Sequence, residues 1–169
     1  MITIEHANHV SRDQFIAAFA DIAEHSPWVA ARAAGRRPFT DRAALIDAFQ
    51  QAVCAAEEGE QLALLQAHPD LAGRAARAGH ITNDSAREQK GAGLDALTDE
   101  EFDRFHTLNE TYKSRFGIPF IYAVKGATKH DILQAFEARL TATQSEEFIT
   151  ALTQVLRIIR FRLTERVAD

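Results

Sequence analysis

Apolar side chains recur every three or four positions along most of the chain. This is the period of one face of an α-helix, and no series of segments alternates polar and apolar residues as half-buried strands do. Start and stop signals divide the pattern into about eight helices. We predict them over residues 11–25, 27–35, 41–59, 61–67, 85–90, 98–117, 129–140 and 146–166. The pattern therefore predicts an all-α fold, a single-domain helical bundle.

Several helix ends rest on local signals in the sequence. Ser11 and Thr98 each open a capping-box pattern, in which the N-cap and N3 side chains satisfy two backbone N–H groups. Pro27 fits the first turn of a helix, where its missing N–H costs nothing. Thr40 or Asp41 can cap the helix that follows. These signals predict helices joined by short loops.

One apolar segment, near residues 117–124, does not fit the helical pattern. Gly117 and Pro119 interrupt it, and its apolar run is continuous rather than periodic. We predict a short, buried, extended segment there.

His68 is the best single candidate for chemistry. The helix over 61–67 should stop there, because Pro69 disfavours the α conformation of the residue before it. A histidine at a helix end beside a rigid proline can be held at a fixed angle in a cleft, and it titrates near neutrality. A surface or capping histidine is the alternative. Asp70 can cap an Ala-rich turn that runs to Gly79.

Two further groups of polar residues are candidates. Glu88 and Gln89 lie in the polar helix over 85–90, for which a solvated helix face is the alternative. Arg160 and Arg162 lie in the apolar C-terminal helix, where an arginine must reach solvent along its stem or pair with an anion.

Composition limits the class of protein. The chain has 169 residues with 46% hydrophobic content, so we expect one domain over 1–169 with one sizeable core. Its 19 basic and 24 acidic residues are interspersed, so we expect no nucleic-acid partner. No stretch approaches the roughly 18 apolar residues of a membrane span, and no leader is evident, so we expect a cytoplasmic protein. Cys54 excludes an internal disulfide because it is the only cysteine, and we interpret it as a buried structural thiol.

Common catalytic motifs are missing. The sequence has no Gly-rich phosphate loop, no paired CxxC signature and no GxSxG elbow. His6 and His9 are spaced like one-turn metal ligands, but they precede the first clear helix and have no carboxylate or cysteine placed to complete a site. We therefore expect no metal site.

Five short motifs resemble those of one family, the 2-oxo-4-hydroxy-4-carboxy-5-ureidoimidazoline (OHCU) decarboxylases. The motifs extend over nearly the whole chain in the family's order, and they are Glu24-His25-Ser26-Pro27-Trp28-Val29, Arg37-Pro38-Phe39, His68-Pro69-Asp70-Leu71, Ser85-Ala86-Arg87-Glu88-Gln89 and Phe116-Gly117-Ile118-Pro119-Phe120-Ile121.

The resemblance implies an all-α enzyme of urate breakdown that converts OHCU to CO2 and (S)-allantoin without a cofactor. It implies that His68 is catalytic, that Glu88 works beside it, and that Arg162, or Arg160 as the alternative, positions the anionic substrate. The residues that it implies for substrate contact are Pro69, Ser85 and Gln89, and the backbone of Phe120, Ile121, Tyr122, Ala123 and Val124.

Two other functions stay open. One is a helical binding or scaffold protein that kept the fold and lost the chemistry, and the other is an enzyme acting on a related ureido or hydantoin acid. The expected partner is a small ureidoimidazoline, with no membrane and no nucleic acid, and a homodimer is the candidate assembly.

Overall fold

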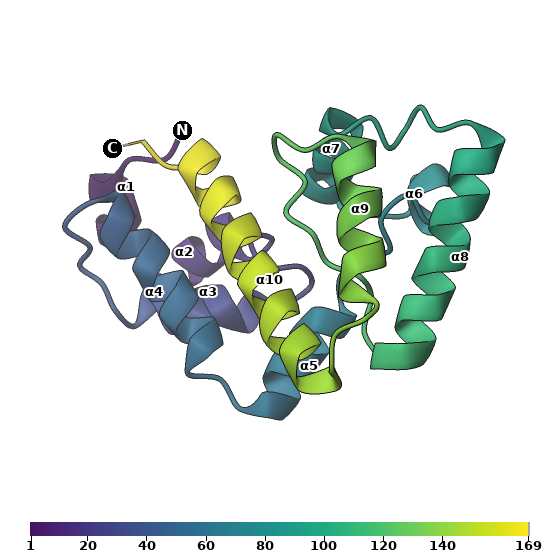
Figure 1. Ribbon diagram of the computed structural model, residues 1–169. Coiled ribbons are helices and arrows are strands. Elements are labelled where there is room, and N and C mark those ends of the chain that lie inside the picture. The colour runs from purple at the N-terminus through teal and green to yellow at the C-terminus, as the bar shows by residue number, and fades with distance from the viewer. Residues whose placement is uncertain (169) are drawn as a thin grey trace. The chain divides into compact units, whose positions relative to one another are not determined.

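Helices make up the regular structure of residues 1–168, the part of the chain that the computed structural model describes (Figure 1). They are α1 (Ile4–His9), α2 (Arg12–Phe19), α3 (Pro27–Ala34), α4 (Arg42–Cys54), α5 (Glu58–Gln66), α6 (Arg74–Arg77), α7 (Asn83–Gly91), α8 (Asp99–Phe116), α9 (Lys129–Arg139) and α10 (Gln144–Arg166). Within these residues the only β-type pairing is an isolated parallel bridge between Ile2 and Val167. The predicted all-α class is confirmed.

The chain forms two compact units. Unit 1 consists of residues 1–67 and those from 156 onward, and unit 2 consists of residues 68–155. α10 therefore begins in unit 2 and ends in unit 1.

Aromatic rings fill the core of unit 1. Phe15 and Phe19, one turn apart on α2, have ring centroids 4.7 Å apart, and the ring of Phe49 from α4 lies 6.0 Å from that of Phe19. Ile159 and Leu163 of α10 are fully buried. These are the apolar faces that the helical spacing predicts.

α2 is shorter than predicted, because it ends at Phe19 and not near His25. Ile22, Ala23 and Glu24 are all buried. Three consecutive residues cover too wide an arc to share one face of a helix, so the chain leaves the helix to bury them. His25 then takes a φ of 46° before α3 begins.

The boundary between α4 and α5 also differs from the prediction. Asp41 caps α4, accepting a hydrogen bond from the Ala44 N–H at 2.8 Å. α4 ends at Cys54, and a capping box between Glu57 and Glu60 starts α5 before Gly59, which therefore does not end α4. Cys54 is exposed, so its interpretation as a buried thiol is wrong.

Two short helices, α1 and α6, were not among the eight that the sequence predicts. Thr3 caps α1, so His6 lies in a helix that the sequence pattern missed. α6 begins after Gly73, so Asp70 does not cap it. Thr82 caps α7, which starts before the predicted Ser85.

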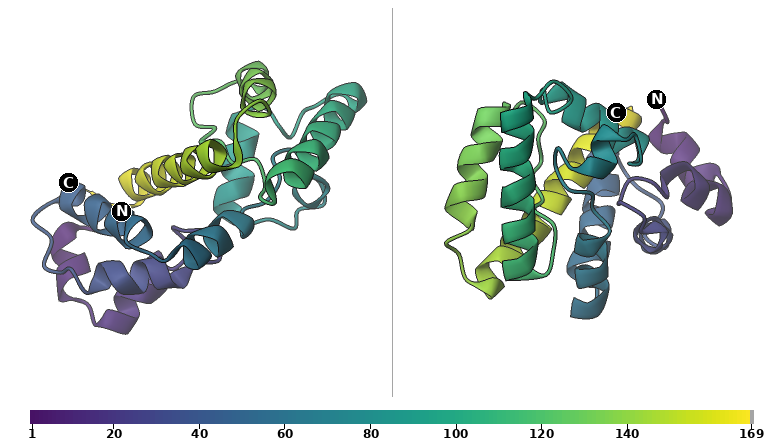
Figure 2. Two further views of the ribbon diagram at one scale, coloured as in Figure 1. Left: turned by 60° about the horizontal axis from the view of Figure 1, so that its bottom comes forward. Right: turned by 90° about the vertical axis from the view of Figure 1, so that its right-hand side faces the viewer.

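The core of unit 2 is built on α8 and α9, which lie side by side (Figure 2). Phe105 and Tyr112 of α8 pack edge-on against Phe136 of α9, with ring centroids 6.3 and 6.0 Å away. Phe120 stacks on Phe136 at 3.7 Å. This ring cluster joins the two helices to the segment that connects them.

The predicted non-helical segment is confirmed over 117–124. Gly117 ends α8 with a φ of 70°, a left-handed conformation that suits glycine. Ile118, Phe120 and Ile121 are buried. The segment therefore lies in the core of unit 2.

Among residues 1–168 we find no helix with the length and apolar character needed to cross a membrane.

Candidate active site

His68 lies just after the end of α5, where the sequence predicts it. α5 ends at Gln66, with Ala67 as its C-cap, so the helix stops before the His68-Pro69 pair. His68 is 8% exposed, which excludes the alternative of a surface histidine.

The loop after Pro69 is clamped by one side chain of α7. Gln89 accepts a hydrogen bond from the Ala72 N–H through Oε1 at 2.9 Å and donates to the Asp70 carbonyl through Nε2 at 3.4 Å. The amide therefore holds both sides of the loop over 70–72. The second N–H of Nε2 is not used in these two contacts.

α8 holds the same loop through two side chains one turn apart. Asn109 donates from Nδ2 to the Leu71 carbonyl at 2.9 Å, and Lys113 pairs with the Asp70 carboxylate at 2.8 Å. The hydrogen bond that the Lys113 ammonium donates to the Asp70 carboxylate raises the pKa of Lys113. α7 and α8 thus fix the backbone that follows His68-Pro69.

The loop is also too tight for a side chain at Gly73. A Cβ there would lie 2.7 Å from the Cβ of Asp70, closer than two such atoms can approach. Ala72 has a φ of 52°, which an L-residue adopts at a cost. Stored strain of this kind is common beside functional sites.

α7 turns polar side chains toward the interior. Ser85 and Gln89, one turn apart, are each 5% exposed, and Glu88 is half-buried. Asp84 is also buried and pairs with Arg87 at 2.9 Å. A solvated helix face is therefore the wrong interpretation for Ser85 and Gln89.

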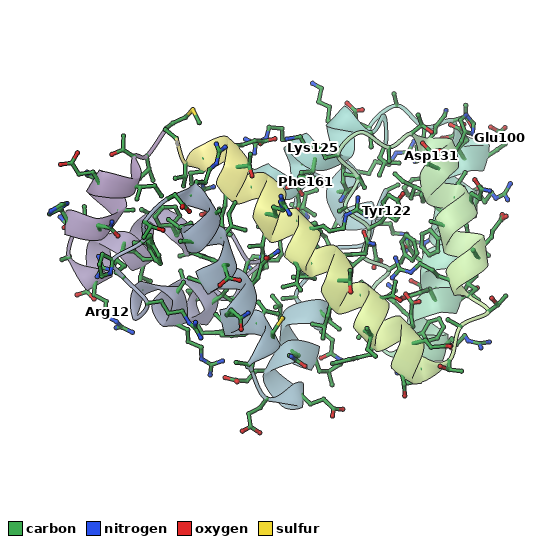
Figure 3. The ribbon with its side chains drawn as sticks, turned by 60° about the vertical axis from the view of Figure 1, so that its left-hand side comes forward. Arg12, Glu100, Tyr122, Lys125, Asp131 and Phe161 are labelled. Atoms are coloured by element: carbon green, nitrogen blue, oxygen red, sulfur yellow. The ribbon has the colours of Figure 1, made fainter. Side chains whose placement is uncertain are left out.

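The segment over 120–124 has two of its backbone groups bound by side chains. The Ile121 carbonyl accepts a hydrogen bond from Arg139 at 2.6 Å, and the Ala123 N–H donates to Oε1 of Gln154 at 3.0 Å. Tyr122 lies between Ile121 and Ala123, on the segment that joins α8 to α9 (Figure 3).

The two candidate arginines of α10 differ in environment. Arg160 is exposed, whereas the side chain of Arg162 is 2% exposed and pairs at 3.0 Å with the carboxylate of Glu24, which is 1% exposed. Arg162 also donates to the Ile22 carbonyl at 3.3 Å. Of the two options open to an arginine in an apolar helix, Arg162 therefore takes the pair with an anion and does not reach solvent.

Glu24 is the residue that sequence reasoning missed. It belongs to the Glu24-His25-Ser26-Pro27 motif, and the Ser26 hydroxyl donates to its carbonyl at 2.9 Å. The sequence carried a signal only for Arg162, because an arginine in an apolar helix must reach solvent or pair with an anion, and nothing in the sequence marks Glu24 as its partner.

The predicted residues fall into both units. Unit 2 holds His68, Pro69, Ser85, Glu88, Gln89 and residues 120–124, and unit 1 holds Arg160 and Arg162. Within unit 2, Gln89 joins α7 directly to the loop after His68-Pro69.

A cavity of about 310 Å³ lies in unit 2. Its lining includes Ala72 and Gly73 of the clamped loop, Gln89 of α7 and Phe102 of α8, but not His68. We do not assign the chemistry to this cavity, because Gln89 is the only predicted site residue that lines it. Within residues 1–168 no group of three or more His, Cys, Asp or Glu side chains is placed to hold a metal ion.

Comparison with known proteins decides the family. The model of one protein family, described as OHCU decarboxylase, matches residues 8–164, which is nearly the whole chain. The chain belongs to the OHCU decarboxylase family.

Individual members of the OHCU decarboxylase family agree over most of the chain. The 2-oxo-4-hydroxy-4-carboxy-5-ureidoimidazoline decarboxylase of Haloferax volcanii is 44% identical over 99% of this chain and 98% of its own length. A uric acid degradation bifunctional protein of Bacillus subtilis is 40% identical over all of this chain, which spans 33% of that protein. A crystal structure of (S)-allantoin synthase matches with a TM-score of 0.81 and 30% identity, over 99% of this chain and 54% of that one.

The hydrogen bonds between Gln89 and the loop over 70–72 predict that replacing Gln89 lowers stability. In Gln89→Met the buried Ala72 N–H loses its acceptor, so we expect a loss of about 1–3 kcal/mol in the free energy of unfolding, measured with urea. The control is Gln51→Met, an exposed glutamine of α4. Equal stability of the two variants would contradict the clamp.

Proposed function

We propose that His68 and Glu88 of this chain carry the decarboxylation of OHCU to CO2 and (S)-allantoin. The chain is a decarboxylase of urate degradation by family membership, and its relatives are named for this chemistry. One observation carries the assignment of residues. Gln89, in the motif that contains Glu88, hydrogen-bonds the loop that follows His68-Pro69, so two distant motifs meet in the fold.

The reaction depends on stabilisation of the negative charge that develops as CO2 leaves, and it needs no nucleophile that bonds covalently to the substrate. As the carbon–carbon bond to the carboxylate breaks, CO2 leaves and its electron pair passes into the conjugated imidazoline ring. The hydroxyl on the same carbon loses a proton as it becomes a carbonyl, and the ring carbon that carries the ureido group gains one. The ring nitrogen that receives the electron pair takes up a second proton, so that one proton is consumed for each CO2 released and the product is neutral. Donors fixed where this charge develops lower the barrier.

His68 is suited to the proton steps. It exchanges a proton with the hydroxyl of the substrate, and its burial beside Pro69 fixes the direction of the imidazole. Glu88 orients that imidazole or the substrate. Protonation of the ring carbon from one face sets the S configuration, and a closed site limits the slow uncatalysed route to racemic allantoin.

The remaining residues bind the substrate in this proposal. Pro69, Ser85 and Gln89 contact it from the loop and α7, and the backbone over 120–124 binds its ring. Arg162 is the proposed anion-binding residue from the family motif, and its planar guanidinium suits a carboxylate.

Assembly and location complete the proposal. The chain acts as one functional domain over 1–169, which the family match over 8–164 supports. The exposed thiol of Cys54 suits the reducing cytoplasm. A homodimer is the proposed assembly, and sedimentation velocity would test it.

Glu88 should affect turnover more than folding. We expect Glu88→Gln to lower kcat by about 10²-fold, because the charge that orients His68 or the substrate is lost while the size is kept. The half-buried position makes a large stability loss unexpected. Steady-state kinetics would measure kcat, with Glu100→Gln in the exposed first turn of α8 as control. A kcat equal to that of the control would remove Glu88 from this role.

Release of CO2 from freshly generated OHCU tests the proposed function directly. We expect the protein to release one CO2 per OHCU at a rate far above the uncatalysed decay. Binding of allantoin-like ligands without CO2 release would favour a binding protein or an enzyme for a related ureido acid.

A further inference from the structure

A buried ion pair holds the segment over 117–124 from one side. Arg139, the last residue of α9, donates from Nη1 to the Ile121 carbonyl and from Nε to Oε1 of Glu147, both at 2.6 Å. The Glu147 side chain is 1% exposed and that of Arg139 is 13% exposed. A pair this buried forms only with accurate geometry, so the guanidinium has little freedom.

Neighbouring elements strengthen the position of this pair. Arg139 lies at the C-terminus of α9 and Glu147 in the first turn of α10, where the helix dipoles favour each charge. The Tyr112 hydroxyl of α8 donates to Glu147. Burial and the hydrogen bond to Glu147 raise the pKa of Tyr112, so the hydroxyl keeps its proton as a donor. Three helices therefore fix one guanidinium.

Gln154 binds the segment two residues beyond Ile121. Its Oε1 accepts the Ala123 N–H at 3.0 Å. In an extended chain the carbonyl of one residue and the N–H two residues later point to the same edge. By this rule the Ile121 carbonyl and the Ala123 N–H share one edge of the non-helical segment, and the N–H and carbonyl of Tyr122 belong to the opposite edge. Neither group makes a hydrogen bond within residues 1–168.

Arg139 also makes the Tyr122 N–H a stronger hydrogen-bond donor. The Ile121 carbonyl and the Tyr122 N–H belong to one peptide group. A positive charge on the carbonyl polarises the whole group, which makes the N–H a stronger donor. The guanidinium carbon lies 4.3 Å from the centroid of the Phe120 ring, a cation–π contact that keeps the charge in place.

We propose that Arg139, assisted by Gln154, is a positioning residue for the decarboxylation. By holding Ile121 and Ala123, these side chains present the N–H and carbonyl of Tyr122 as a preorganised donor–acceptor pair for the amide-like N–H and C=O groups of a ureidoimidazoline. The inference rests on the proposed function and adds to it the residues that determine binding of the ring.

The test separates binding from chemistry. The double variant Arg139→Met with Glu147→Gln removes the clamp without leaving a buried charge alone, and Gln can still accept from Tyr112. Gln154→Met removes the second hydrogen bond. The control is Arg115→Met, because Arg115 is an exposed arginine of the same unit that contacts the Phe116 ring and the Ala142 carbonyl but not the segment.

Three quantities are measured for each variant. CO2 release gives kcat and KM for OHCU, and calorimetry gives Kd for (S)-allantoin. We expect the double variant to raise KM and Kd about tenfold with kcat changed much less, because about 1.4 kcal/mol of preorganised binding is lost. Gln154→Met should raise both in the same direction by about threefold. The control should match the parent.

The outcomes are distinguishable. A folded double variant with the parent's KM and Kd would overturn the inference. If the double variant fails to fold, Gln154→Met decides, and the parent's KM and Kd in that variant would overturn the inference. A fall in kcat with unchanged KM would also overturn it, since positioning of the ring acts on binding. A parent that releases no CO2 would overturn the proposed function, and the inference with it.

Discussion

Replacing His68 with Gln is expected to lower kcat for OHCU by about 10³-fold with little change in stability. General acid–base groups contribute about 10²–10⁴-fold to rates, and Gln has no group that exchanges a proton near neutrality. The side chain is buried in a loop held by α7 and α8, so Gln of similar length should be accommodated. The residual rate should yield allantoin with little preference for the S form.

The matched control for this prediction is His80→Gln, which changes an exposed histidine of the same unit. Steady-state kinetics would give kcat, and thermal unfolding would show that both variants fold. Turnover of His68→Gln within about threefold of His80→Gln would be too small a change for a general acid–base group and would remove His68 from the mechanism.

Arg162→Met is expected to cost about 3–5 kcal/mol of unfolding free energy, the typical cost of leaving one member of a buried ion pair alone. The Glu24 carboxylate would remain buried, with its side chain 1% exposed, without the guanidinium at 3.0 Å. Adding Glu24→Met should recover much of the loss, because the double variant buries no unpaired charge. Urea unfolding of the parent, both single variants and the double variant would measure the coupling.

The pair of Arg166 and Asp21 in the same unit, which is more exposed to solvent, is the control. Asp21 is 60% exposed in its side chain, so Arg166→Met should cost at most about 1 kcal/mol. A similar cost for both arginines would contradict the structural role of Glu24. Arg162→Lys keeps a charge beside Glu24, so a loss of activity in a stable Lys variant would support the proposed substrate contact of the guanidinium.

Local signals predicted much of the fold because they act within a few residues. The capping boxes at Ser11 and Thr98, the stop at Gly117 and the effect of Pro69 on His68 depend on neighbours in sequence, and all four appear in the structure. Such signals fix helix ends without any knowledge of the core.

Tertiary contacts explain where the sequence pattern failed. α2 ends early because burial of Ile22, Ala23 and Glu24 outweighs continuation of the helix. The capping box at Glu57 was missed because glutamate is a less usual cap than Ser, Thr, Asp or Asn. The first error concerns competition between local preference and packing, and the second concerns a local signal that was not recognised.

The site could be predicted only in part for the same reason. Motifs indicated His68 and Gln89, but no spacing rule connects Gln89 to the carbonyl of Asp70. The partners Glu24 and Arg162 are separated by 138 positions, and only the fold joins them. Residues that position other residues are recognised from their contacts in the structure. Candidates for proton transfer are recognised in the sequence from the chemistry of their side chains.

The most direct test of the central claim is circular dichroism of OHCU generated in place from urate by uricase and hydroxyisourate hydrolase, with and without this protein. We predict rapid appearance of the (S)-allantoin signal only when the protein is present. An unchanged slow decay to racemic allantoin would contradict the account.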